Sequence, residues 1–587
     1  MSGLAPTKPN DAFEALPEAL SELIGRVIRG TRLWPSEKRD VRAELESHFR
    51  EGLIELTQEG LTVAESVEVL RDGFGDPETA AILIRRGKKR GRSMLWKITI
   101  SAAMVLFSVV GAGAGYFAYV QFGQPNPTVD YVAQINEPVR QTPEADRAWP
   151  LYHEIIQAMD LMPALAAARQ SMPRATDAGW QEVLPWLTAN RRLVSRILDA
   201  AQKPVFGYVY GHDSAREYLI RRALAVGEAG TPEEAAARID QEGDPLMPPT
   251  ISLLLPHLTD MRDLGRLLVL SAREHLSHGD FEEAWGELDA CHRMGVQLLG
   301  GQTLVEQLVG VSIARMATEE MRRTLSEQHA ALNPGQIKVL SGSHVLVVAP
   351  ETYRANLAGE RFFFHDCVQY LFTDDGAGSG RLIPSQYDKL RWMGQSASPT
   401  QSDSALGAIG KDAELLAIAT AHADRRETLE KHQEMWERMN ELLALPLYDS
   451  RRAEADRMIE RETGGSKGRR FALIALLLPS LSTADRTFRE AAMEHVATQA
   501  VIAMVQYRAA HAAWPERLDD LSPEYLRQVP VDAYTGIYLR YGLTEAGVPL
   551  LYSVGRDMQD DGGSTELVES GGGRPQTRDI VYWPTSN

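Results

Sequence analysis

One stretch of this sequence restricts the possible folds more than any other. Residues 98–120, ITISAAMVLFSVVGAGAGYFAYV, are 23 residues long and carry no charged side chain. As a helix they extend about 35 Å, and the hydrocarbon core of a bilayer is about 30 Å thick. Trp96 precedes the run and aromatic residues lie at its far end, as is typical of membrane–water interfaces. We therefore predict a transmembrane helix; the alternative is a buried helix of a soluble domain.

The charges that flank this run predict its orientation. Seven basic residues precede it: Arg85, Arg86, Lys88, Lys89, Arg90, Arg92 and Lys97. The first basic residue after it is Arg140. Because lysine and arginine are retained in the cytoplasm, the N-terminus is predicted to lie inside and the C-terminal region outside. Since 97 residues precede the run, we expect an uncleaved signal anchor rather than a cleaved signal peptide.

The run also predicts partners. Gly111 and Gly115 form a GxxxG pair, which lets two helix backbones approach closely and favours a homodimer. The alternative is the ordinary enrichment of glycine in membrane helices. Membrane lipid is a second expected partner. Nucleic acid is not expected, because a net charge of −18 opposes binding to phosphates.

Changes of pattern along the chain predict a mainly α single-pass membrane protein. The expected parts are a cytoplasmic helical domain (1–92), the transmembrane signal anchor (93–122), a Pro-rich stalk (123–150), a large exported helical domain (151–484) and a small α+β module (485–587). Apolar residues recur with helical spacing in the first and fourth parts. Five prolines in the third part favour extended chain.

The first part resembles a known bacterial module. The relevant motifs are ELESH at 44–48, EGL at 59–61 and FGDP at 74–77, within residues 41–84. This stretch resembles the HAAS-type, or permease-prefix, helical domain that precedes membrane spans in many bacterial proteins. The resemblance implies a cytoplasmic docking or signalling module without catalysis. It also implies a bacterial cytoplasmic (inner) membrane, with the C-terminal region periplasmic or extracellular.

The exported body shows helices but no catalytic motif. Residues 260–278 and 281–299 form two amphipathic helices around Gly279 and Asp280, and residues 303–325 supply a third. This pattern resembles a tetratricopeptide hairpin, with a generic helical bundle as the alternative. There is no HExxH, GxSxG or phosphate-loop motif, so no catalytic residue is predicted. Two cysteines, Cys291 and Cys367, leave their redox state open.

The C-terminal part combines a helix with short strands. A helix over 485–511 is followed by IYLRYGL and PLLYSVG, with Gly536, Gly542, Gly547 and Gly555 expected at turns. Alternating apolar runs between glycines predict a small antiparallel sheet. The order resembles the soluble head of a type II secretion major pseudopilin, on the motifs WP at 514–515, PVD at 530–532, YSVG at 552–555 and DI at 579–580.

That resemblance implies a calcium ion in the last loop. The positions that correspond are Ser553, Asp557, Asp560 and Asp579. Calcium prefers several oxygen ligands, and clustered carboxylates favour a bound cation. A solvated acidic loop is the alternative. The chain departs from the pseudopilins because it has no prepilin cleavage motif and its helix lies far from the anchor.

These observations predict a single-pass envelope protein that acts as a protein-binding scaffold or a transmembrane signalling component. Protein partners are expected on both sides of the membrane. The alternatives are an exported hydrolase-type enzyme and an accessory factor of a pseudopilin or secretion system. The layout is also similar to envelope proteins of planctomycete-like bacteria.

Overall fold

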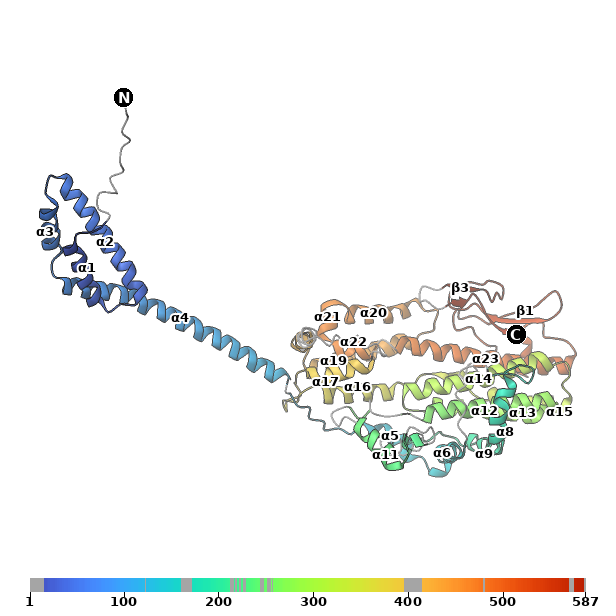
Figure 1. Ribbon diagram of the computed structural model, residues 1–587. Coiled ribbons are helices and arrows are strands. Elements are labelled where there is room, and N and C mark those ends of the chain that lie inside the picture. Colours follow the sequence, from blue (N-terminus) through green and yellow to red (C-terminus); the bar gives the residue numbers. More distant parts are fainter. Residues whose placement is uncertain are drawn as a thin grey trace. The chain divides into compact units, whose positions relative to one another are not determined.

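The protein is mainly helical and carries a small antiparallel sheet near its C-terminus (Figure 1). The computed structural model describes residues 15–121, 123–159, 172–211, 229–242, 257–394, 414–478, 481–569 and 575–584, with isolated positions between 216 and 255. The chain divides into two compact units, which we call unit 1 (Met1–Phe117) and unit 2 (Ala118–Asn587).

Unit 1 is built from short helices and the start of one long helix. The helices are α1 (Glu18–Thr31), α2 (Pro35–Gln58), α3 (Val63–Phe74) and α4 (Pro77–Gln121). The helical spacing predicted for α1 is confirmed, because Leu20, Leu23 and Ile24 are buried against Phe49 and Leu53 of α2. In α3, Val67 packs on this core, whereas Val63 and Val69 are exposed.

Helix α4 contains the apolar run. Asp76 caps it, accepting hydrogen bonds from the backbone N–H of Glu78 at 3.3 Å and of Thr79 at 2.9 Å. The helix continues without a break through Ile98–Tyr119, a 22-residue stretch of mean hydropathy 1.9 whose most apolar window has no buried residue. By length and composition, it is the one helix among the described residues that could cross a membrane.

Unit 2 consists of helices followed by short strands. The helices are α5 (Tyr131–Gln141), α6 (Trp149–Ala158), α8 (Trp180–Asn190), α9 (Val194–Ala201), α11 (Pro232–Glu242), α12 (His257–His278), α13 (Phe281–Leu299), α14 (Leu304–Gln328), α15 (Pro334–Ser341), α16 (Ala358–Leu371), α17 (Pro384–Gly394), α19 (Arg425–Ala444), α20 (Ala453–Thr463), α21 (Gly465–Arg470), α22 (Ala472–Leu477) and α23 (Leu481–His511). The strands are β1 (Arg540–Leu543), β2 (Pro549–Ser553), β3 (Leu567–Glu569), β4 (Pro575–Thr577) and β5 (Ile580–Trp583).

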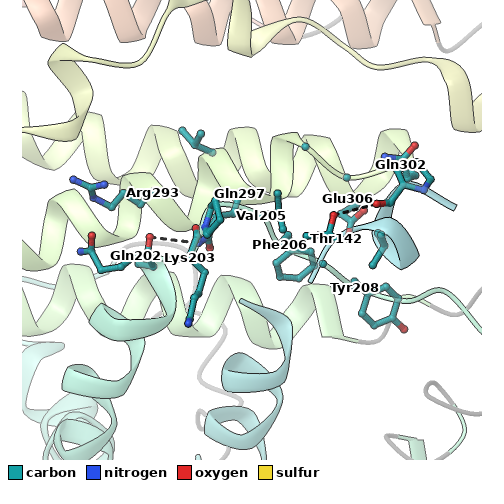
Figure 2. A pocket seen from close by; sticks show the side chains of 18 of the residues that line it. Thr142, Gln202, Lys203, Val205, Phe206, Tyr208, Arg293, Gln297, Gln302 and Glu306 are labelled. Carbon is teal, nitrogen blue, oxygen red and sulfur yellow. Dashed lines mark hydrogen bonds between the residues drawn. The ribbon is translucent and has the colours of Figure 1, made fainter. Parts of the chain in front are cut away.

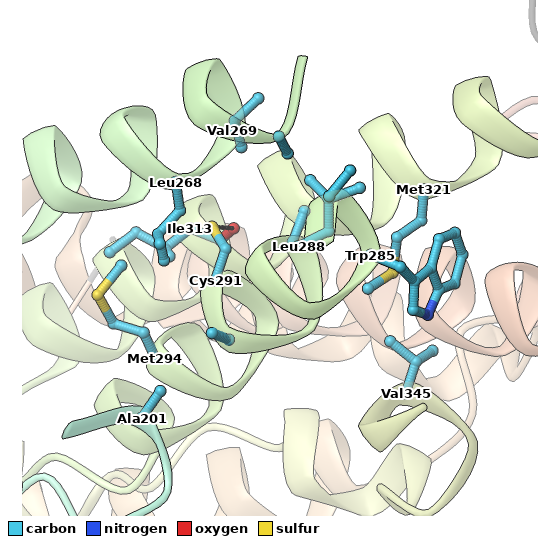
Figure 3. Close-up of a cluster of buried hydrophobic side chains, with 14 of the residues drawn as sticks. Ala201, Leu268, Val269, Trp285, Leu288, Cys291, Met294, Ile313, Met321 and Val345 are labelled. Atoms are coloured by element: carbon cyan, nitrogen blue, oxygen red, sulfur yellow. Dashed lines mark hydrogen bonds between the residues drawn. The ribbon is translucent and has the colours of Figure 1, made fainter. Parts of the chain in front are cut away.

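The core of unit 2 lies between α12, α13, α14 and α23. The two helices predicted around Gly279 are confirmed: α12 and α13 are joined through this residue, whose φ of +87° is easily adopted without a side chain. The resemblance to a tetratricopeptide hairpin stays a prediction. Figure 3 shows Leu288, Cys291 and Met294 of α13 packed among residues of α12 and α14. Cys291 and Cys367 are both free and buried, so each acts as a small apolar residue in its core.

Two glycines bring α13 and α14 into close contact. A Cβ at Gly295 would lie 2.5 Å from the backbone nitrogen of Ala314, and one at Gly310 would lie 2.7 Å from the carbonyl oxygen of Gly295. Side chains at either position would force the helices apart. The pair of glycines therefore sets the spacing of the two helices.

The Pro-rich segment differs from the prediction of an extended stalk. Residues 131–141 form α5, with Pro138 inside the helix and Ile135 and Asn136 buried. The segment before it is held against α16, because Gln369 accepts hydrogen bonds from the N–H groups of Thr128 and Val129, both at 3.2 Å. Proline density predicted extended chain, but the apolar and amide side chains between the prolines make packing contacts.

The C-terminal strands confirm the small antiparallel sheet. The strand order is β1-β2-β5, with β3 and β4 paired separately. Gly536, Gly547 and Gly555 have positive φ angles as expected for turns, whereas Gly542 lies inside β1. Residues of α23 and of this sheet belong to the same apolar cluster as α12–α14, so residues 485–587 share the core of unit 2.

The close contact of α13 and α14 predicts opposite effects for two glycines of one helix. Replacement of Gly295 by Ala should lower the free energy of unfolding by about 1–3 kcal/mol, because the added methyl group meets backbone atoms. The matched control is Gly286→Ala, also in α13, where an added Cβ meets nothing within 4 Å. That variant should gain up to about 1 kcal/mol of helix propensity. Urea unfolding of both variants tests this, and equal stabilities would contradict the proposed spacing.

Candidate functional site

A cavity of about 300 Å³ lies in unit 2 beside the loop that joins α13 to α14. One wall is the last two turns of α13, and the opposite wall is the chain between residues 202 and 210. The end of α5 contributes Pro138, Val139 and Thr142. Figure 2 shows Arg293 and Gln202 towards one end of this site and Gln302, Glu306 and Tyr208 towards the other.

The aromatic wall comes from alternating residues of an extended segment. Phe206, Tyr208 and Tyr210 are all buried, and their period of two places them on one side of the chain. Asn136 of α5 holds this segment in place: its side-chain amide donates to the carbonyl of Tyr210 at 2.6 Å, and its oxygen accepts from the Tyr210 N–H at 2.7 Å. The same segment is also bonded to the start of α6, where the N–H of Trp149 donates to the carbonyl of Phe206 at 2.8 Å.

Gln297 fixes the opposite wall to the end of α9. Its amide nitrogen donates to the carbonyls of Ala200, Ala201 and Lys203 at 3.1, 3.3 and 2.7 Å. Its oxygen accepts a hydrogen bond from the Tyr152 hydroxyl at 2.8 Å. Carbonyls at the end of a helix have no hydrogen-bond donor within the helix, and the side-chain amide of Gln297 provides one. This side chain therefore positions the wall and has no free polar atom.

Glu306 is the buried carboxylate of the cavity. It lies in the first turn of α14, is fully buried, and accepts a hydrogen bond from the Tyr210 hydroxyl. Its Oε1 atom is 3.8 Å from Nε2 of His257 and has no hydrogen-bond partner. The carboxylate fits here only because residue 301 is a glycine. A Cβ at that position would lie 2.0 Å from the carboxylate and would clash with it. An acceptor without a donor is costly when buried.

The hydroxyls of the two tyrosines near Glu306 are neutral. Burial raises the pKa of Tyr210, and the adjacent Glu306 carboxylate raises it further. The same two causes raise the pKa of Tyr208. Tyr208 also stacks on the ring of His257, with centroids 3.9 Å apart. His257 is buried behind this stack and does not line the cavity, so it is not placed to exchange a proton with a bound molecule.

The other end of the cavity is cationic. Arg293 donates from Nε to Asp289 at 3.1 Å, and Lys203 donates to the carbonyl of Ala145 at 2.8 Å. Asp289 in turn accepts from the Ser343 hydroxyl at 2.9 Å and from the His344 N–H at 2.6 Å. The cavity thus offers an acceptor at one end and cationic donors at the other.

A cluster of histidines lies next to the cationic end. Nδ1 of His292 is 3.2 Å from Nδ1 of His344, and its Nε2 is 2.9 Å from the Tyr353 hydroxyl. His495 stacks on His292 and donates to the carbonyl of Val348 at 2.9 Å. Burial lowers the pKa of His495 and of His344 to about 4, and burial and the two neighbouring imidazoles lower the pKa of His292. The cluster is therefore neutral near pH 7.

The structure places the four predicted calcium ligands in different surroundings. Asp579 is fully buried; its Oδ2 accepts from two backbone N–H groups, and its Oδ1 has no partner. Ser553 is also buried and accepts from the Gly555 N–H at 3.2 Å. Asp557 accepts from the Gln559 N–H at 3.1 Å. Asp560 pairs with Arg540 at 2.9 Å.

Only some of the side chains in this loop are therefore suited to bind a cation. Oδ1 of Asp579 fits, because it has no hydrogen-bond partner among the described residues. Asp561, which is not one of the four predicted ligands, also has an unpartnered Oδ2, but its Oδ1 pairs with Arg578 at 3.2 Å. Asp560 fits poorly because Arg540 already neutralises it. Among the described residues, no three His, Cys, Asp or Glu side chains are grouped so that they could hold a metal ion. Calcium binding stays a prediction.

Sequence reasoning did not find the cavity. Its residues come from α5, the 202–210 segment, α13 and α14, and only their packing brings them together. One local signal was present: the aromatic residues at 206, 208 and 210 alternate within VFGYVYG. A strand-like pattern inside a helical region indicates a special local environment.

No protein-family model, curated protein or solved structure matches this chain.

The histidine cluster predicts a loss of stability in acid. Below pH 6.5 the unfolded chain binds protons at its histidines, whereas the folded cluster stays neutral, so stability falls as the pH drops towards 4. The variant His495→Gln keeps a donor for Val348 and removes one buried imidazole. When the pH falls from 7.5 to 5, the free energy of unfolding of this variant should decrease by about 2 kcal/mol less than that of the original protein. Unfolding at pH 8, where both forms are neutral, provides the packing control, and parallel pH curves would refute the assignment.

The acidic loop predicts a calcium effect on stability. If the ion binds at Asp579, calcium at 100 times its dissociation constant should stabilise the full chain in detergent by about 2.7 kcal/mol. Thermal unfolding after removal of divalent ions, with calcium or magnesium then added back, measures this, and Asp579→Asn should abolish the gain. Unchanged melting together with no heat in a calorimetric titration would rule out the site.

Proposed function

We propose that this protein is a single-pass envelope protein that holds a helical binding body at a membrane. The observation that carries the proposal is the Ile98–Tyr119 segment of α4, which is long and apolar enough to span a bilayer and has no protein cover over its most apolar window. Its side chains need another apolar environment.

Burial of the exposed apolar side chains of this segment would release a large free energy. Met104, Val105, Leu106, Phe107 and Val109 are all at least 59% exposed. Burial of one such side chain contributes about 1.5–3 kcal/mol, so the exposed set amounts to about 10 kcal/mol. Exposure of this size in water marks an interaction surface. A lipid environment satisfies every side of the helix at once, as no single protein partner does.

The charge asymmetry supports an N-terminus in the cytoplasm. Basic residues are frequent before the segment, between Arg85 and Lys97, and none occurs between Ile98 and Val139. This arrangement favours retention of unit 1 inside and export of the chain that follows. With the bacterial resemblance of unit 1, the membrane we propose is the bacterial cytoplasmic (inner) membrane, with unit 2 in the periplasm or outside the cell.

Each part of the chain offers a surface for a partner. In unit 1, a groove of about 710 Å³ between α2 and α4 is lined by Val41, Leu45, His48 and Ile84 with neighbouring charged residues. Residues of the ELESH motif thus form part of this groove, which supports a docking role for the HAAS-like domain. In unit 2, the cavity beside α13 and α14 supports ligand or peptide binding. Protein partners are accordingly proposed on both sides of the membrane.

The homodimer remains part of the proposal. Within the chain, a Cβ at Gly111 or Gly115 would meet nothing within 4 Å, so this face of α4 is open to a second helix. Small residues at this spacing favour close packing of membrane helices. The scaffold or signalling role proposed from the sequence is compatible with such a pair.

A second candidate function is an exported hydrolase-type enzyme. One observation favours it: a histidine and an acid, His257 and Glu306, are adjacent at 3.8 Å. The first candidate is preferred because His257 is 1% exposed and does not line the cavity. The role of accessory factor in a secretion system rests on the pseudopilin resemblance alone.

Charged substitutions in the apolar segment test the anchor. The double variant Val109→Arg/Val110→Arg should fail to integrate, because each arginine at a membrane-helix centre costs about 2.5–3.5 kcal/mol. The matched control is Val347→Arg, which changes another exposed valine, in unit 2, and should remain in the membrane fraction. Resistance to alkaline carbonate extraction measures integration.

The same preparations test the orientation. Alkaline phosphatase fused to the C-terminus should be active, because it folds only after export, whereas a green fluorescent fusion should be dark. Release of the original chain by carbonate would falsify the anchor, and a fluorescent C-terminal fusion would overturn the orientation.

A further inference from the structure

We propose that a groove of unit 2 binds a small organic anion with an apolar body, of the aryl- or alkyl-carboxylate class. The groove is lined by residues of α16 and α19 and shares no lining residue with the cavity beside α13 and α14. The inference goes beyond the binding role proposed above, because it concerns a second site and names the chemical class of its ligand.

Helices α16 and α19, which supply two walls of the groove, lie close together in unit 2 (Figure 1). Phe364 of α16 stacks on His432 of α19 with ring centroids 3.6 Å apart, and both residues are buried. The α16 wall includes Ala358, Arg361 and Phe362. The α19 wall has the spacing i, i+4, i+7 and i+8 of one helix face: Trp436, Asn440, Leu443 and Ala444. The buried stack fixes both walls, so the groove is formed before a ligand arrives.

The floor of the groove is apolar and partly aromatic. Trp436 and Leu443 are buried, at 7% and 6% exposed, and Phe362 is half-buried. Such side chains pack favourably against an aromatic ring or an alkyl chain. The indole N–H of Trp436 makes no hydrogen bond to the described residues, and an acceptor on a ligand would pair with it. The floor therefore suits a ligand that is apolar over most of its surface and carries an acceptor.

Two arginines of the groove have free guanidinium groups. Arg354 and Arg361 line the groove and are exposed, and their side chains form no hydrogen bond or ion pair with the described residues. A guanidinium group binds a carboxylate with two parallel, charge-assisted hydrogen bonds. Because both side chains are accessible to solvent, a ligand can reach them without a change in the protein. The arginines therefore select an anionic group.

The one acid in the lining of the groove does not neutralise these arginines. Asp485 is buried and already pairs with Arg452 at 2.5 Å and with Arg489 at 3.5 Å. Burial, Arg452 and Arg354 lower the pKa of Arg489, and the opposing effect of Asp485 is smaller than their sum. The groove thus keeps an excess of positive charge in a chain whose net charge is −18. This charge favours an anion over a neutral or cationic ligand of the same shape.

The size of the groove favours a small molecule over a protein or a membrane lipid. Eleven residues line the groove, whereas a stable protein interface takes about 20–30 residues on each side. The volume of about 490 Å³ lies within the range of small-molecule sites. At about 30 Å³ for each water-sized group, it holds roughly 16 such groups, far fewer than a two-chain phospholipid contains. A single aromatic or alkyl body with one anionic group fits this space.

Calorimetric titration of the full chain in phosphatidylcholine nanodiscs, with empty nanodiscs as the blank, tests the proposal. The probe is 4-phenylbutyrate, which joins a carboxylate to an aromatic body. It should bind about tenfold more tightly than 4-phenylbutanol, which lacks the charge, and than butyrate, which lacks the ring. The cation 4-phenylbutylamine should give no saturable heat.

Three variants assign the binding to the groove. Arg354→Gln/Arg361→Gln should bind 4-phenylbutyrate and 4-phenylbutanol equally, because the charges that distinguish them are removed. Ala358→Phe, at an exposed position of the lining, should weaken both about tenfold, because the added ring occupies the groove. The matched control is Arg469→Gln/Arg527→Gln, which removes two exposed arginines outside the lining and should keep the original preference.

Two results with the original chain overturn the proposal, whether or not a variant folds. One is equal affinity for 4-phenylbutyrate and 4-phenylbutanol, and the other is the absence of saturable heat at millimolar 4-phenylbutyrate. An unchanged preference in the folded double arginine variant also overturns it. Carbonate extraction and the C-terminal fusions decide the anchor and the orientation separately, so failure of the anion site and failure of the proposed function are distinct outcomes.

Discussion

The close approach of α13 and α14 is the contact on which the rest of unit 2 depends. Gly295 and Gly310 face each other's backbones at a distance that no side chain tolerates. Because the two helices pack this closely, the loop between them is short, and it turns directly over Glu306. The same helices supply much of the central apolar cluster, which also includes residues of α12, α23 and the C-terminal sheet. The cavity is thus a consequence of how the core is packed.

The polar groups around the cavity divide into two kinds. Asn136 is engaged by backbone groups of Tyr210, and Gln297 by backbone carbonyls and the Tyr152 hydroxyl, so both side chains fix the walls. Glu306 is different, because its buried Oε1 has no hydrogen-bond partner among the described residues. The histidine cluster is mostly of the first kind, since His292 is hydrogen-bonded to His344 and Tyr353, and His495 donates to the carbonyl of Val348. Rigid, satisfied walls with a few unsatisfied groups are the arrangement expected of a preorganised binding site.

Local patterns predicted the elements well and their assembly poorly. The apolar face of α1, the Asp76 cap of α4, the helices α12 and α13, and the short C-terminal strands all follow from residues near each other in sequence. The stalk prediction was wrong because proline frequency says nothing about the buried side chains of Ile135 and Asn136, and Asn136 has its partner, Tyr210, 74 residues away. In the same way, Gly542 lies in a strand although its neighbours suggested a turn. Asp561 became a candidate ligand only when its unpartnered oxygen was seen.

The sequence by itself determined that this chain has one helix suited to a membrane, a basic flank on one side of it, and helices of defined length on both sides. These properties depend on composition and on periods of a few residues, which any local segment carries. Only the tertiary structure decided where the cavity of unit 2 forms. Asn136, Tyr210, Arg293 and Glu306 gain their roles from contacts between distant segments, and the geometry of those contacts is fixed by packing rather than by any motif.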